Sequence, residues 1–545
     1  MLPILRVLNK SGQKVLDIIS FAVQVDVDQF YGIEYDEWPA RISEVALWLT
    51  DHQMNLAVSE EFGQYFTRLP LKKAAEIVHG NALRLDWEEI IPKEELNYIL
   101  GNPPFYGKQL QSKEQKQDMA MVFKGVKGSG VLDYVTAWYI QAAEYIQGTS
   151  IKCSFVSTSS ICQGEQAIIL WHELFNKYNI KIHFGHQVFK WRNEAKGVAA
   201  VYVVIIGFGN FDISNKALFH YDNVTSEPQC IKAKQINQYL IDYNETLLKS
   251  RTKPICEVPL MMYGSKPVDN GNLLLSEEEK EELILNEPKS EKYIKPLISA
   301  REYLNGKKRW CLWLKDALPS DIRSMPQVLQ RVDNVKTFRQ NSKKKSTQEA
   351  ANWPTIFTEM RQPESEFIFF PLTTSENRIY IPLEFFEKDN IVNNSCSVIP
   401  NATIYHFGVL SSQMHFTWMN YICGRLEGRY RYSNKIVYNN FTWPKNPTPK
   451  NKNKVKTCAQ NVLDVRAKFP ESSLADLYHP LTMPPELVKA HQALDKAADL
   501  CYRKRAFPNE MARIEFLFDL YNEYAQPLLT ATKKTKKAKK KKRSG

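Results

Sequence analysis

The sequence has no Cys-x-x-Cys pair, no signal peptide and no apolar stretch long enough to cross a bilayer. Its nine cysteines occur singly among 545 residues, which argues against a zinc ribbon and favours reduced thiols in a cytosol. The longest apolar run, residues 198–208, is far shorter than the roughly 20 residues of a membrane helix. No small-residue cleavage site follows Met1. We therefore expect a soluble, cytoplasmic protein with no membrane partner.

Positive charge is concentrated near the carboxyl end. Residues 531–545 contain eight lysines, one arginine and no acid, so nine of the net +12 charges lie there and +3 remain for the rest. This low-complexity tail is predicted to be disordered. It would add sequence-independent DNA affinity, or it is a solvated tail without a specific partner. DNA binding by the rest of the chain must therefore depend on local patches.

The tetrapeptide Asn102-Pro103-Pro104-Phe105 joins a polar amide, a stiff backbone and an aromatic ring. The prolines disfavour a helix, so the Pro103 carbonyl stays available as an acceptor beside the Asn102 side-chain oxygen. Two such acceptors would grip the hydrogens of a planar amino group, and a base would stack on Phe105. An ordinary turn after a strand is the alternative, since Asn-Pro often initiates turns.

Three predicted strands deliver polar residues at their carboxyl ends. They span residues 29–36, 75–79 and 97–100. Their ends carry Glu34, Asn81 and Asn102, in the layout by which open α/β sheets bind ligands. An acid at such a position commonly binds ribose hydroxyls, which favours Glu34. Asp36 lies beside it, or it merely caps the helix that begins near Pro39.

Three segments give the chain a family resemblance. They read FYGIEYDEWPARISEVALWLTDHQMN at residues 30–55, HGNAL at 79–83 and GNPPF at 101–105. Over most of its length the chain resembles the MmeI-like (type IIL) restriction–modification enzymes, which contain a class I adenine-specific DNA methyltransferase. The resemblance implies a Rossmann-like α/β sheet, S-adenosylmethionine as methyl donor, adenine in double-stranded DNA as acceptor, and no metal.

The resemblance also assigns cofactor-binding roles to residues at the first two strand ends. Glu34, with Asp36 beside it, would hold the cofactor ribose. Asn81 and Ala82 would lie at the cofactor's adenine. These roles make one edge of the predicted sheet the methyl-donor side of the site.

The acceptor side is assigned in the same way to Asn102, Pro103, Pro104 and Phe105, which would hold a base flipped out of the duplex. Methyl transfer would be direct and in line. The amino nitrogen loses its proton only after it has become positively charged, so no general base is needed before attack. Catalysis would then consist mostly of positioning.

Two further segments resemble parts of the family pattern. Residues 131–134 would help to wall the cofactor pocket, or Asp133 merely lies in the first turn of a helix. Phe189 or Trp191, just before the buried strand at 198–208, lies where such enzymes place an aromatic residue near the target base. Plain core packing is the alternative for both rings.

The chain departs from the family pattern at its amino-terminal end. Enzymes of this class open with a strand and a Gly-x-Gly turn that approaches the methionine part of the cofactor. Residues 2–19 instead resemble the helix after that turn, and Gly12 cannot serve as the loop. We therefore expect an N-terminally truncated methyltransferase sheet, either a truncated or split-gene product or a chain whose true start lies upstream. A separate upstream polypeptide that supplies the missing strand would restore the site. No nuclease domain precedes residue 25, so endonuclease activity is not expected.

Target recognition is expected from residues 213–438, which resemble the family's α+β recognition domain. Arg361 and Arg378 lie where side chains would contact DNA, and arginine pairs naturally with guanine. Residues 375–377, Ser-Glu-Asn, would also contact DNA, or they simply form a turn, in which these residue types are common.

A basic patch covers residues 424–456, where many cations accompany a single acid. Arg429, Arg431 and Lys435 belong to it. The interleaved aromatic residues are Tyr430, Tyr432, Tyr438, Phe441 and Trp443. Such alternation fits phosphate clamps around a deformed duplex, and a solvated basic loop is the alternative.

The length predicts three or four folded units, at about one per 150 residues. We place the methyltransferase domain at 1–212, the recognition domain at 213–438, a small helical C-terminal domain at 439–530 and the basic tail at 531–545. Strand-like pieces occur at 367–370 and 378–382, a helix-rich insert at 276–297, and helical periodicity at 455–468, 484–502 and 510–524.

Together these features predict a site-specific adenine methyltransferase that acts on duplex DNA within a restriction–modification system. The alternative is a catalytically inactive, truncated remnant that only binds DNA. A third hypothesis is methylation of a protein glutamine amide, which the same four residues would fit. The large recognition region argues against that third hypothesis.

Overall fold

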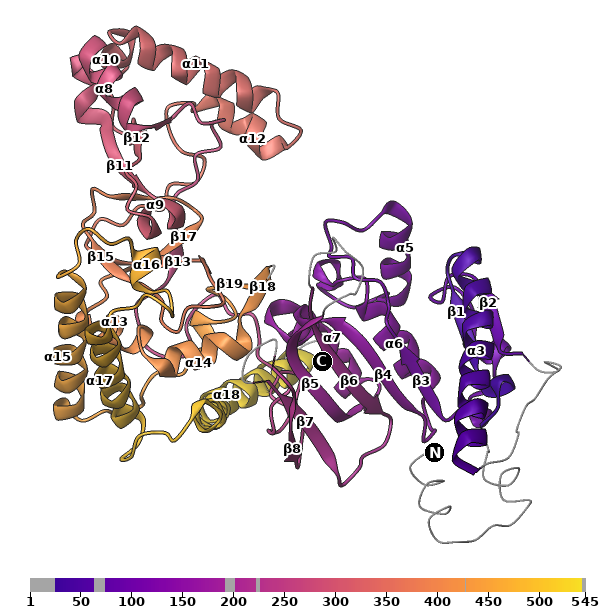
Figure 1. Ribbon diagram of the computed structural model, residues 1–545. Helices are drawn as coiled ribbons and strands as arrows, with labels where there is room; N and C mark the ends of the chain where they lie inside the picture. Colours follow the sequence, from indigo (N-terminus) through magenta and orange to yellow (C-terminus); the bar gives the residue numbers. More distant parts are fainter. Residues whose placement is uncertain (1–24, 63–73, 192–200, 222–225, 427, 542–545) are drawn as a thin grey trace. The chain divides into compact units, whose positions relative to one another are not determined.

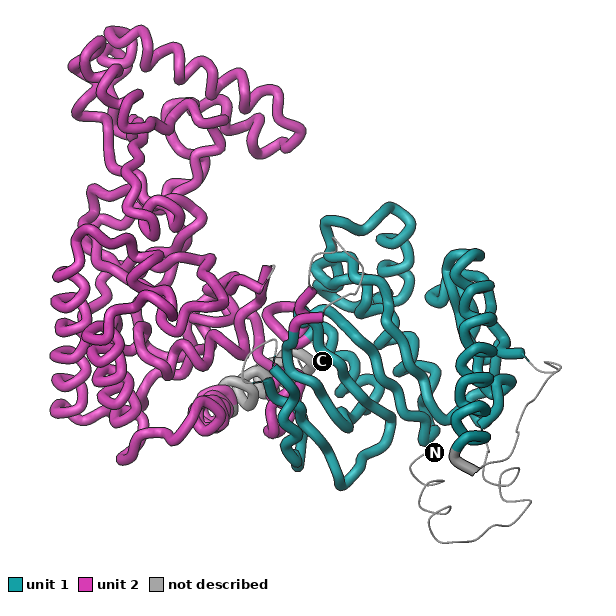
Figure 2. Tube along the Cα trace, viewed as in Figure 1, with its two compact units in different colours: residues 1–161, 169–189, 203–236 teal, residues 162–168, 190–202, 237–545 magenta. Residues whose placement is uncertain are grey.

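The computed structural model of the protein describes residues 25–62, 74–191, 201–221, 226–426 and 428–541 (Figure 1). The chain forms two compact units (Figure 2). Unit 1 comprises residues 1–161, 169–189 and 203–236, and unit 2 comprises residues 162–168, 190–202 and 237–545. The helix predicted at residues 2–19 lies outside the described residues. No helix in the described part of the chain is both long and apolar enough to span a membrane.

Unit 1 is built around a six-stranded mixed sheet with the order β3-β4-β6-β5-β7-β8. Strands β3 and β4 run parallel, and β6 runs antiparallel to β4. The strands are β3 (Tyr98–Gly101), β4 (Lys152–Thr158), β5 (Lys181–Trp191), β6 (Val201–Gly209), β7 (Lys216–His220) and β8 (Gln229–Ala233). The α/β fold class is confirmed, and the sheet continues beyond residue 212, where the sequence places the end of the domain.

A separate two-stranded sheet contains β1 (Tyr31–Glu34) and β2 (Glu76–His79), which run parallel and flank helix α3 (Glu37–Phe62) in the chain. These two strands and β3 confirm the three strands predicted from the sequence. Among the described residues, β1 pairs only with β2, and β3 pairs only with β4. Each of β1 and β3 therefore has one open edge.

Aromatic packing fixes two helices, α6 (Thr136–Tyr145) and α7 (Gly164–Asn176), on the six-stranded sheet. Helices α4 (Trp87–Ile90) and α5 (Lys113–Val122) precede them in the chain. The Tyr139 ring of α6 stacks on Phe208 of β6 at 5.3 Å between centroids and meets Phe155 of β4 edge-on at 5.3 Å. Trp171 of α7 lies 6.1 Å from Tyr139 and donates a hydrogen bond to the Ile161 carbonyl. All four rings are at most 2% exposed, so this core holds β4 rigidly.

Unit 2 contains three small sheets. Their orders are β15-β13-β17-β9, β10-β12-β11-β16 and β14-β19-β18. The strands are β9 (Met262–Tyr263), β10 (Leu274–Leu275), β11 (Ile294–Ile298), β12 (Trp310–Leu312), β13 (Phe367–Pro371), β14 (Thr373–Thr374), β15 (Glu384–Phe386), β16 (Ile391–Val392), β17 (Cys396–Pro400), β18 (Gly424–Leu426) and β19 (Arg429–Arg431). Every residue of β13 is buried, as its unbroken apolar run predicts, so the strand predicted at 367–370 is confirmed.

The strand predicted at residues 378–382 is wrong, because this segment forms no strand. Side chains bind it in place of a neighbouring strand: the Gln413 amide donates to the Ile379 carbonyl at 2.8 Å, and Tyr380 is buried. The insert predicted to be helix-rich contains helix α8 (Glu277–Asn286), a 3-10 turn and then β11. Its second half is therefore partly extended.

Helix α11 (Pro326–Gln340) of unit 2 packs on a buried cluster that includes Leu273 and Leu312. Other helices of this unit pack against one another: α13 (Ile404–Leu410), α14 (Gln413–Ile422), α15 (Pro449–Arg466), α17 (Pro485–Tyr502) and α18 (Glu510–Lys541). The last three confirm the predicted carboxyl-terminal helices. Helix α18 continues through most of the tail that composition predicts to be disordered. Alanine and lysine are both good helix formers, which gives a physical reason for the difference.

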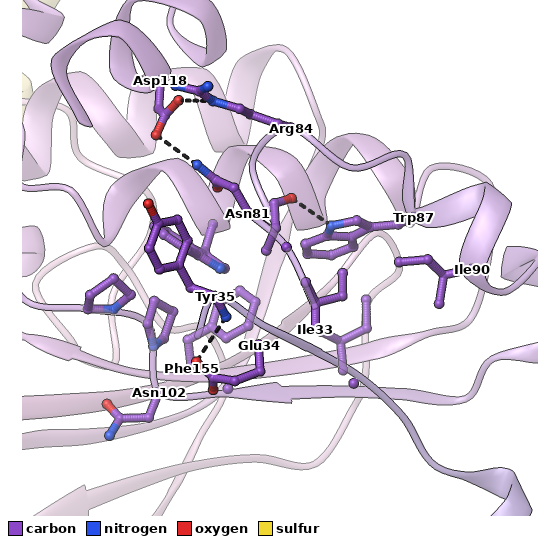
Figure 3. Close-up of a pocket in the computed structure, with 18 of the residues that line it drawn as sticks. Ile33, Glu34, Tyr35, Asn81, Arg84, Trp87, Ile90, Asn102, Asp118 and Phe155 are labelled. Carbon is purple, nitrogen blue, oxygen red and sulfur yellow. Dashed lines mark hydrogen bonds and ion pairs between the residues drawn. The ribbon is translucent and has the colours of Figure 1, made fainter. Parts of the chain in front are cut away.

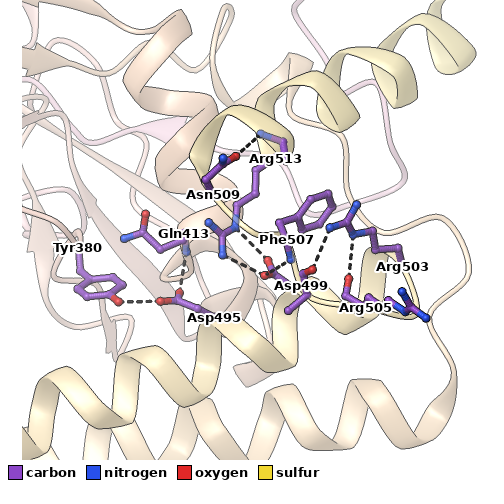
Figure 4. A network of polar contacts seen from close by, with 11 residues as sticks. Tyr380, Gln413, Asp495, Asp499, Arg503, Arg505, Phe507, Asn509 and Arg513 are labelled. Carbon is purple, nitrogen blue, oxygen red and sulfur yellow. Dashed lines mark hydrogen bonds and ion pairs between the residues drawn. The ribbon is translucent and has the colours of Figure 1, made fainter. Parts of the chain in front are cut away.

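Two buried carboxylates connect α17 with its surroundings (Figure 4). Asp495 accepts hydrogen bonds from the Tyr380 hydroxyl at 2.6 Å and from the Gln413 backbone amide at 2.8 Å. Asp499 accepts from two guanidinium nitrogens of Arg513, at 3.1 and 2.9 Å. Burial raises the pKa of Asp495 to about 6, despite these two donors. Asp495 is therefore poised to take up a proton in the folded state.

We predict that lowering the pH from 7 to 5 stabilises the protein relative to an Asp495→Asn variant. A carboxyl whose folded-state pKa is raised contributes stability that is fully present below its unfolded pKa and is lost as the pH rises through about 6. The difference in unfolding free energy, wild type minus variant, should be larger at pH 5 than at pH 7 by about 1 kcal/mol. Urea unfolding at both pH values measures it, and an equal difference at the two would contradict the assignment.

Candidate active site

The carboxyl ends of β1, β2 and β3 open onto one cavity of about 910 Å³ in unit 1 (Figure 3). Glu34, Asn81 and Asn102, which follow or end these strands, all line it. Phe155 contributes an aromatic wall from β4. The structure thus brings together residues that lie far apart in the sequence, as the three-strand pattern predicts.

Glu34 is held at the rim of the cavity by the backbone that follows β1. Its Oε1 atom accepts from the amides of Tyr35 at 2.9 Å and Asp36 at 3.4 Å. A carboxylate offers about four lone-pair sites, so these bonds leave acceptor capacity for the hydroxyls of a ligand. Asp36 and Tyr35 also line the cavity, and Tyr35 is 66% exposed.

Asn81 belongs to a polar network on the opposite wall. Its Nδ2 donates to Asp118 at 3.0 Å, and its Oδ1 accepts from the Leu83 amide at 2.9 Å. Ala82, also on the cavity wall, accepts at its carbonyl from the Trp87 indole at 2.9 Å. The residues at which the sequence predicts an adenine-binding wall are thus held in a fixed geometry.

Asp118 receives two further donors, from Arg84 at 2.7 Å and the Tyr134 hydroxyl at 2.7 Å. The hydrogen bond and charge of Asp118 raise the pKa of Arg84. Burial, followed by the bond to Asp118, raises the pKa of Tyr134, which therefore stays a neutral donor. Sequence analysis assigned no role to Asp118 or Arg84, because a single acid in a polar helix gives no signal of its own.

The Asn102–Phe105 turn follows β3 directly. Asn102 and Pro104 are exposed while Pro103 is buried, and all three line the cavity. Phe105 is half-buried and does not line the cavity, whereas the neighbouring Tyr106 does. Tyr106, and not Phe105, therefore contributes an aromatic ring to the lining of this cavity.

Two close contacts fix the start and end of this turn. A side chain at Gly101 would place its Cβ 3.2 Å from two ring carbons of Phe155, so any other residue would require this buried ring to shift by a few tenths of an ångström. After the turn, the Tyr106 carbonyl accepts from the Tyr134 amide at 2.9 Å. The turn is thus anchored to the wall that carries Asp118.

Asp133 lies behind the same turn. Its Oδ2 accepts from the hydroxyls of Thr158, at 3.2 Å, and Ser160. Its backbone carbonyl accepts from Thr136, the first residue of α6. Asp133 therefore connects the end of β4 with the start of α6. This position agrees with the alternative given by the sequence, in which Asp133 lies at the start of a helix.

The two aromatic candidates at the end of β5 differ in their surroundings. Phe189 stacks on Tyr221 at 5.0 Å between ring centroids and lies 6.1 Å from the His186 ring. Trp191 is the last residue of β5 and is 38% exposed. Phe189 thus has a packing role, and Trp191 keeps more of its ring open to solvent.

The five predicted DNA-contacting cations all lie in unit 2. Arg361 pairs with Glu359, and Arg378 donates to the Thr374 hydroxyl at 3.1 Å. Arg429, Arg431 and Lys435 are exposed. The two arginines flank the buried Tyr430 on β19, because side chains alternate along a strand.

The aromatic half of the predicted phosphate clamp is wrong. The five rings, Tyr430, Tyr432, Tyr438, Phe441 and Trp443, are each at most 4% exposed. Two of them contact His415 of α14. The ring centroids of His415 and Phe441 lie 5.0 Å apart, and His415 Nε2 shares a hydrogen bond with the Tyr432 hydroxyl. Arg425, another cation of the patch, lies 4.0 Å over the Tyr430 ring. Only the exposed cations remain as a surface for DNA.

No group of three or more His, Cys, Asp or Glu side chains in the described part of the chain is placed to hold a metal ion.

Sequence models of three MmeI domains match the chain. The DNA-methyltransferase domain matches residues 4–220, the target recognition domain 242–445 and the C-terminal domain 447–529. The structure of the type IIL restriction–modification enzyme MmeI in complex with DNA is similar to this chain at 48% identity with a TM-score of 0.84, over 94% of this chain and 68% of that one.

DNA methyltransferase A of Bacillus subtilis (strain 168) is 39% identical over 521 residues, which are 95% of this chain and 58% of that protein. The chain thus spans a little over half the length of this relative. The fold, the strand-end cavity and the three matched domains define a DNA-methyltransferase protein that carries its own target recognition domain. Within that class, the chain belongs to the MmeI family of type IIL restriction–modification enzymes.

Proposed function

We propose that this protein transfers a methyl group from S-adenosylmethionine to the exocyclic amino group of adenine at a specific site in duplex DNA, as the modification part of a restriction–modification system. The observation that carries the proposal is the convergence of Glu34, Asn81 and Asn102 on one cavity. Membership of the MmeI family and the methyltransferase name of the B. subtilis relative support it. Nine unpaired cysteines and a DNA substrate favour the cytoplasm as its location.

On the acceptor side, the Asn102 oxygen and the Pro103 carbonyl would accept the two hydrogens of the adenine amino group. An amino nitrogen conjugated to a purine ring is a poor nucleophile, and two acceptors favour a more tetrahedral nitrogen. Pro104 stiffens the turn so that both acceptors keep their positions. The flipped base would stack on Phe105 or Tyr106, and Trp191 at the end of β5 is the more exposed of the other two aromatic candidates.

On the donor side, Glu34 would accept from the cofactor's ribose hydroxyls, with Asp36 beside it. Asn81 and Ala82 would contact the cofactor's adenine. The cofactor supplies an electrophilic methyl group, and the chain's residues orient the acceptor nitrogen in line with it. Positioning of this kind accounts for most of the rate enhancement expected in a direct transfer.

We also infer that a further strand, from outside the described residues, pairs with the edges of β1 and β3 that the described residues leave open. The open edges of both strands line the same cavity, and the large side chains Tyr98 and Leu100 on β3 are 62% and 77% exposed. On α3 an apolar stripe is at least half exposed, at Trp38, Ile42, Val45 and Leu49. An open edge beside exposed apolar surface is a template for another strand.

We predict that this chain alone binds S-adenosylmethionine at least 10-fold more weakly than when co-expressed with the segments of the B. subtilis relative that lie outside the 521 matched residues. The added strand would supply backbone contacts to the cofactor. Isothermal titration calorimetry measures both affinities. The matched control is Glu34→Ala, which leaves both strand edges intact and should lower cofactor affinity in either sample. If the chain alone binds S-adenosylmethionine as tightly as the co-expressed sample does, the added segments are not needed for cofactor binding and the inference is contradicted.

We predict that Asn102→Ala lowers methyl transfer by about 100-fold or more, because it removes one of two acceptors at the reacting nitrogen. Asn102 is exposed in the cavity, so the fold and DNA affinity should be unchanged. Asn102→Asp keeps an oxygen acceptor of the same reach and should retain more activity than alanine. Single-turnover transfer and a DNA-binding titration measure these effects. Loss of DNA binding in the alanine variant would instead assign Asn102 a structural role.

For DNA binding, we predict that replacing both Arg429 and Arg431 with alanine reduces the slope of log affinity against log salt by about 2, since each lost phosphate contact contributes about 0.9. Lys489→Ala on α17 removes an exposed cation elsewhere and should leave the slope unchanged. Fluorescence anisotropy across a salt series measures both. An unchanged slope in the double variant would remove these arginines from the DNA surface.

A further inference from the structure

Asp118 is a buried carboxylate without a role in the mechanism above. It is 2% exposed and lies on α5, whose start is fixed by a capping box between Ser112 and Gln115. Three donors reach it: the Asn81 amide, the Arg84 guanidinium and the Tyr134 hydroxyl. All four side chains line the cavity, and Figure 3 shows Asp118 joined to Asn81 and Arg84. The Arg84 charge offsets the cost of burying this carboxylate.

These contacts allow only one orientation of the Asn81 amide. An ionised carboxylate accepts and cannot donate, so the nitrogen of Asn81 must face Asp118. The oxygen then faces the Leu83 amide, from which it accepts at 2.9 Å. The reversed amide would set two oxygens against each other and leave the Leu83 amide facing a donor. The second lone pair of the Asn81 oxygen remains available to a ligand.

We propose that Asp118 is a positioning residue that locks the Asn81 amide and thereby makes this cavity selective for a ligand with a purine 6-amino group over one with a 6-oxo group. A 6-amino group donates to the fixed oxygen of Asn81. A 6-oxo group would place a second acceptor there. The proposal rests on the proposed function, because the 6-amino ligand is the adenosine part of the methyl donor.

The test compares the binding of S-adenosylhomocysteine and S-inosylhomocysteine by equilibrium dialysis. The protein is co-expressed with the segments of the B. subtilis relative that lie outside the 521 matched residues. The wild-type protein should prefer the 6-amino ligand by about 10-fold or more, the usual effect of one hydrogen bond. In Asp118→Asn, Arg84 can only donate and keeps the remaining oxygen of residue 118, so the new amide nitrogen faces the Asn81 nitrogen. Residue 118 then no longer holds the Asn81 amide in the wild-type orientation, and the preference should fall to within about threefold.

The matched control is Tyr134→Phe, which removes the Tyr134 hydroxyl from both Asp118 and Asn81 but leaves the bond between the Asn81 nitrogen and Asp118 in place. It should keep the wild-type preference. If Asp118→Asn weakens both ligands by the same factor, Asp118 has only a structural role and the proposal is overturned. The same conclusion follows if the preference in Asp118→Asn equals that of the wild type.

A second readout separates this inference from the proposed function. Release of the lock frees the Asn81 oxygen from the Leu83 amide, so hydrogen exchange at Leu83 should be at least about 10-fold faster in Asp118→Asn than in the wild type or Tyr134→Phe. If neither nucleoside binds any of the proteins, the proposed methyl-donor function is wrong. The exchange rate of the Leu83 amide then tests by itself whether Asp118 fixes the orientation of the Asn81 amide. Unchanged exchange at Leu83 would refute it.

Discussion

The candidate site depends on one constraint: the carboxyl ends of the parallel pair β1–β2 and of β3, which belong to two different sheets among the described residues, open onto the same cavity. Strand β1 presents Glu34, the turn after β2 presents Asn81, and the turn after β3 presents Asn102, all at one cavity. No long loop is needed to bring these residues together. The buried rings of Tyr139 and Phe155 hold the neighbouring sheet in place, so the acceptor turn starts from a rigid strand.

The same constraint explains the difference between the two sides of the cavity. The acceptor turn is fixed at both ends, by Gly101 against Phe155 and by the Tyr106 carbonyl. The donor side lies on a two-stranded sheet, and the described residues leave one edge of β1 and one edge of β3 open. In the proposed function, cofactor affinity should therefore depend on what pairs with those edges, whereas the turn proposed to hold the acceptor base is already fixed.

Much of this arrangement could be predicted from the sequence, because strand periodicity and polar strand ends are local signals. The three short strands, β13 and the carboxyl-terminal helices were all identifiable in this way. Asp118 was not, since its partners Asn81 and Arg84 lie 37 and 34 positions away and only the folded chain brings them together. The aromatic residues of the basic patch were misassigned to DNA because alternation gives the period of a strand and not the face that is buried.

The most direct test of the account identifies the atom that receives the methyl group. The protein, with the strand-supplying segments, would be incubated with methyl-labelled S-adenosylmethionine and a mixed library of DNA duplexes, and the digested nucleosides would be analysed by mass spectrometry. The account predicts label only in N6-methyladenine, in duplexes that share one sequence. Label in a cytosine, or in the glutamine of an added protein and in no duplex, would contradict it.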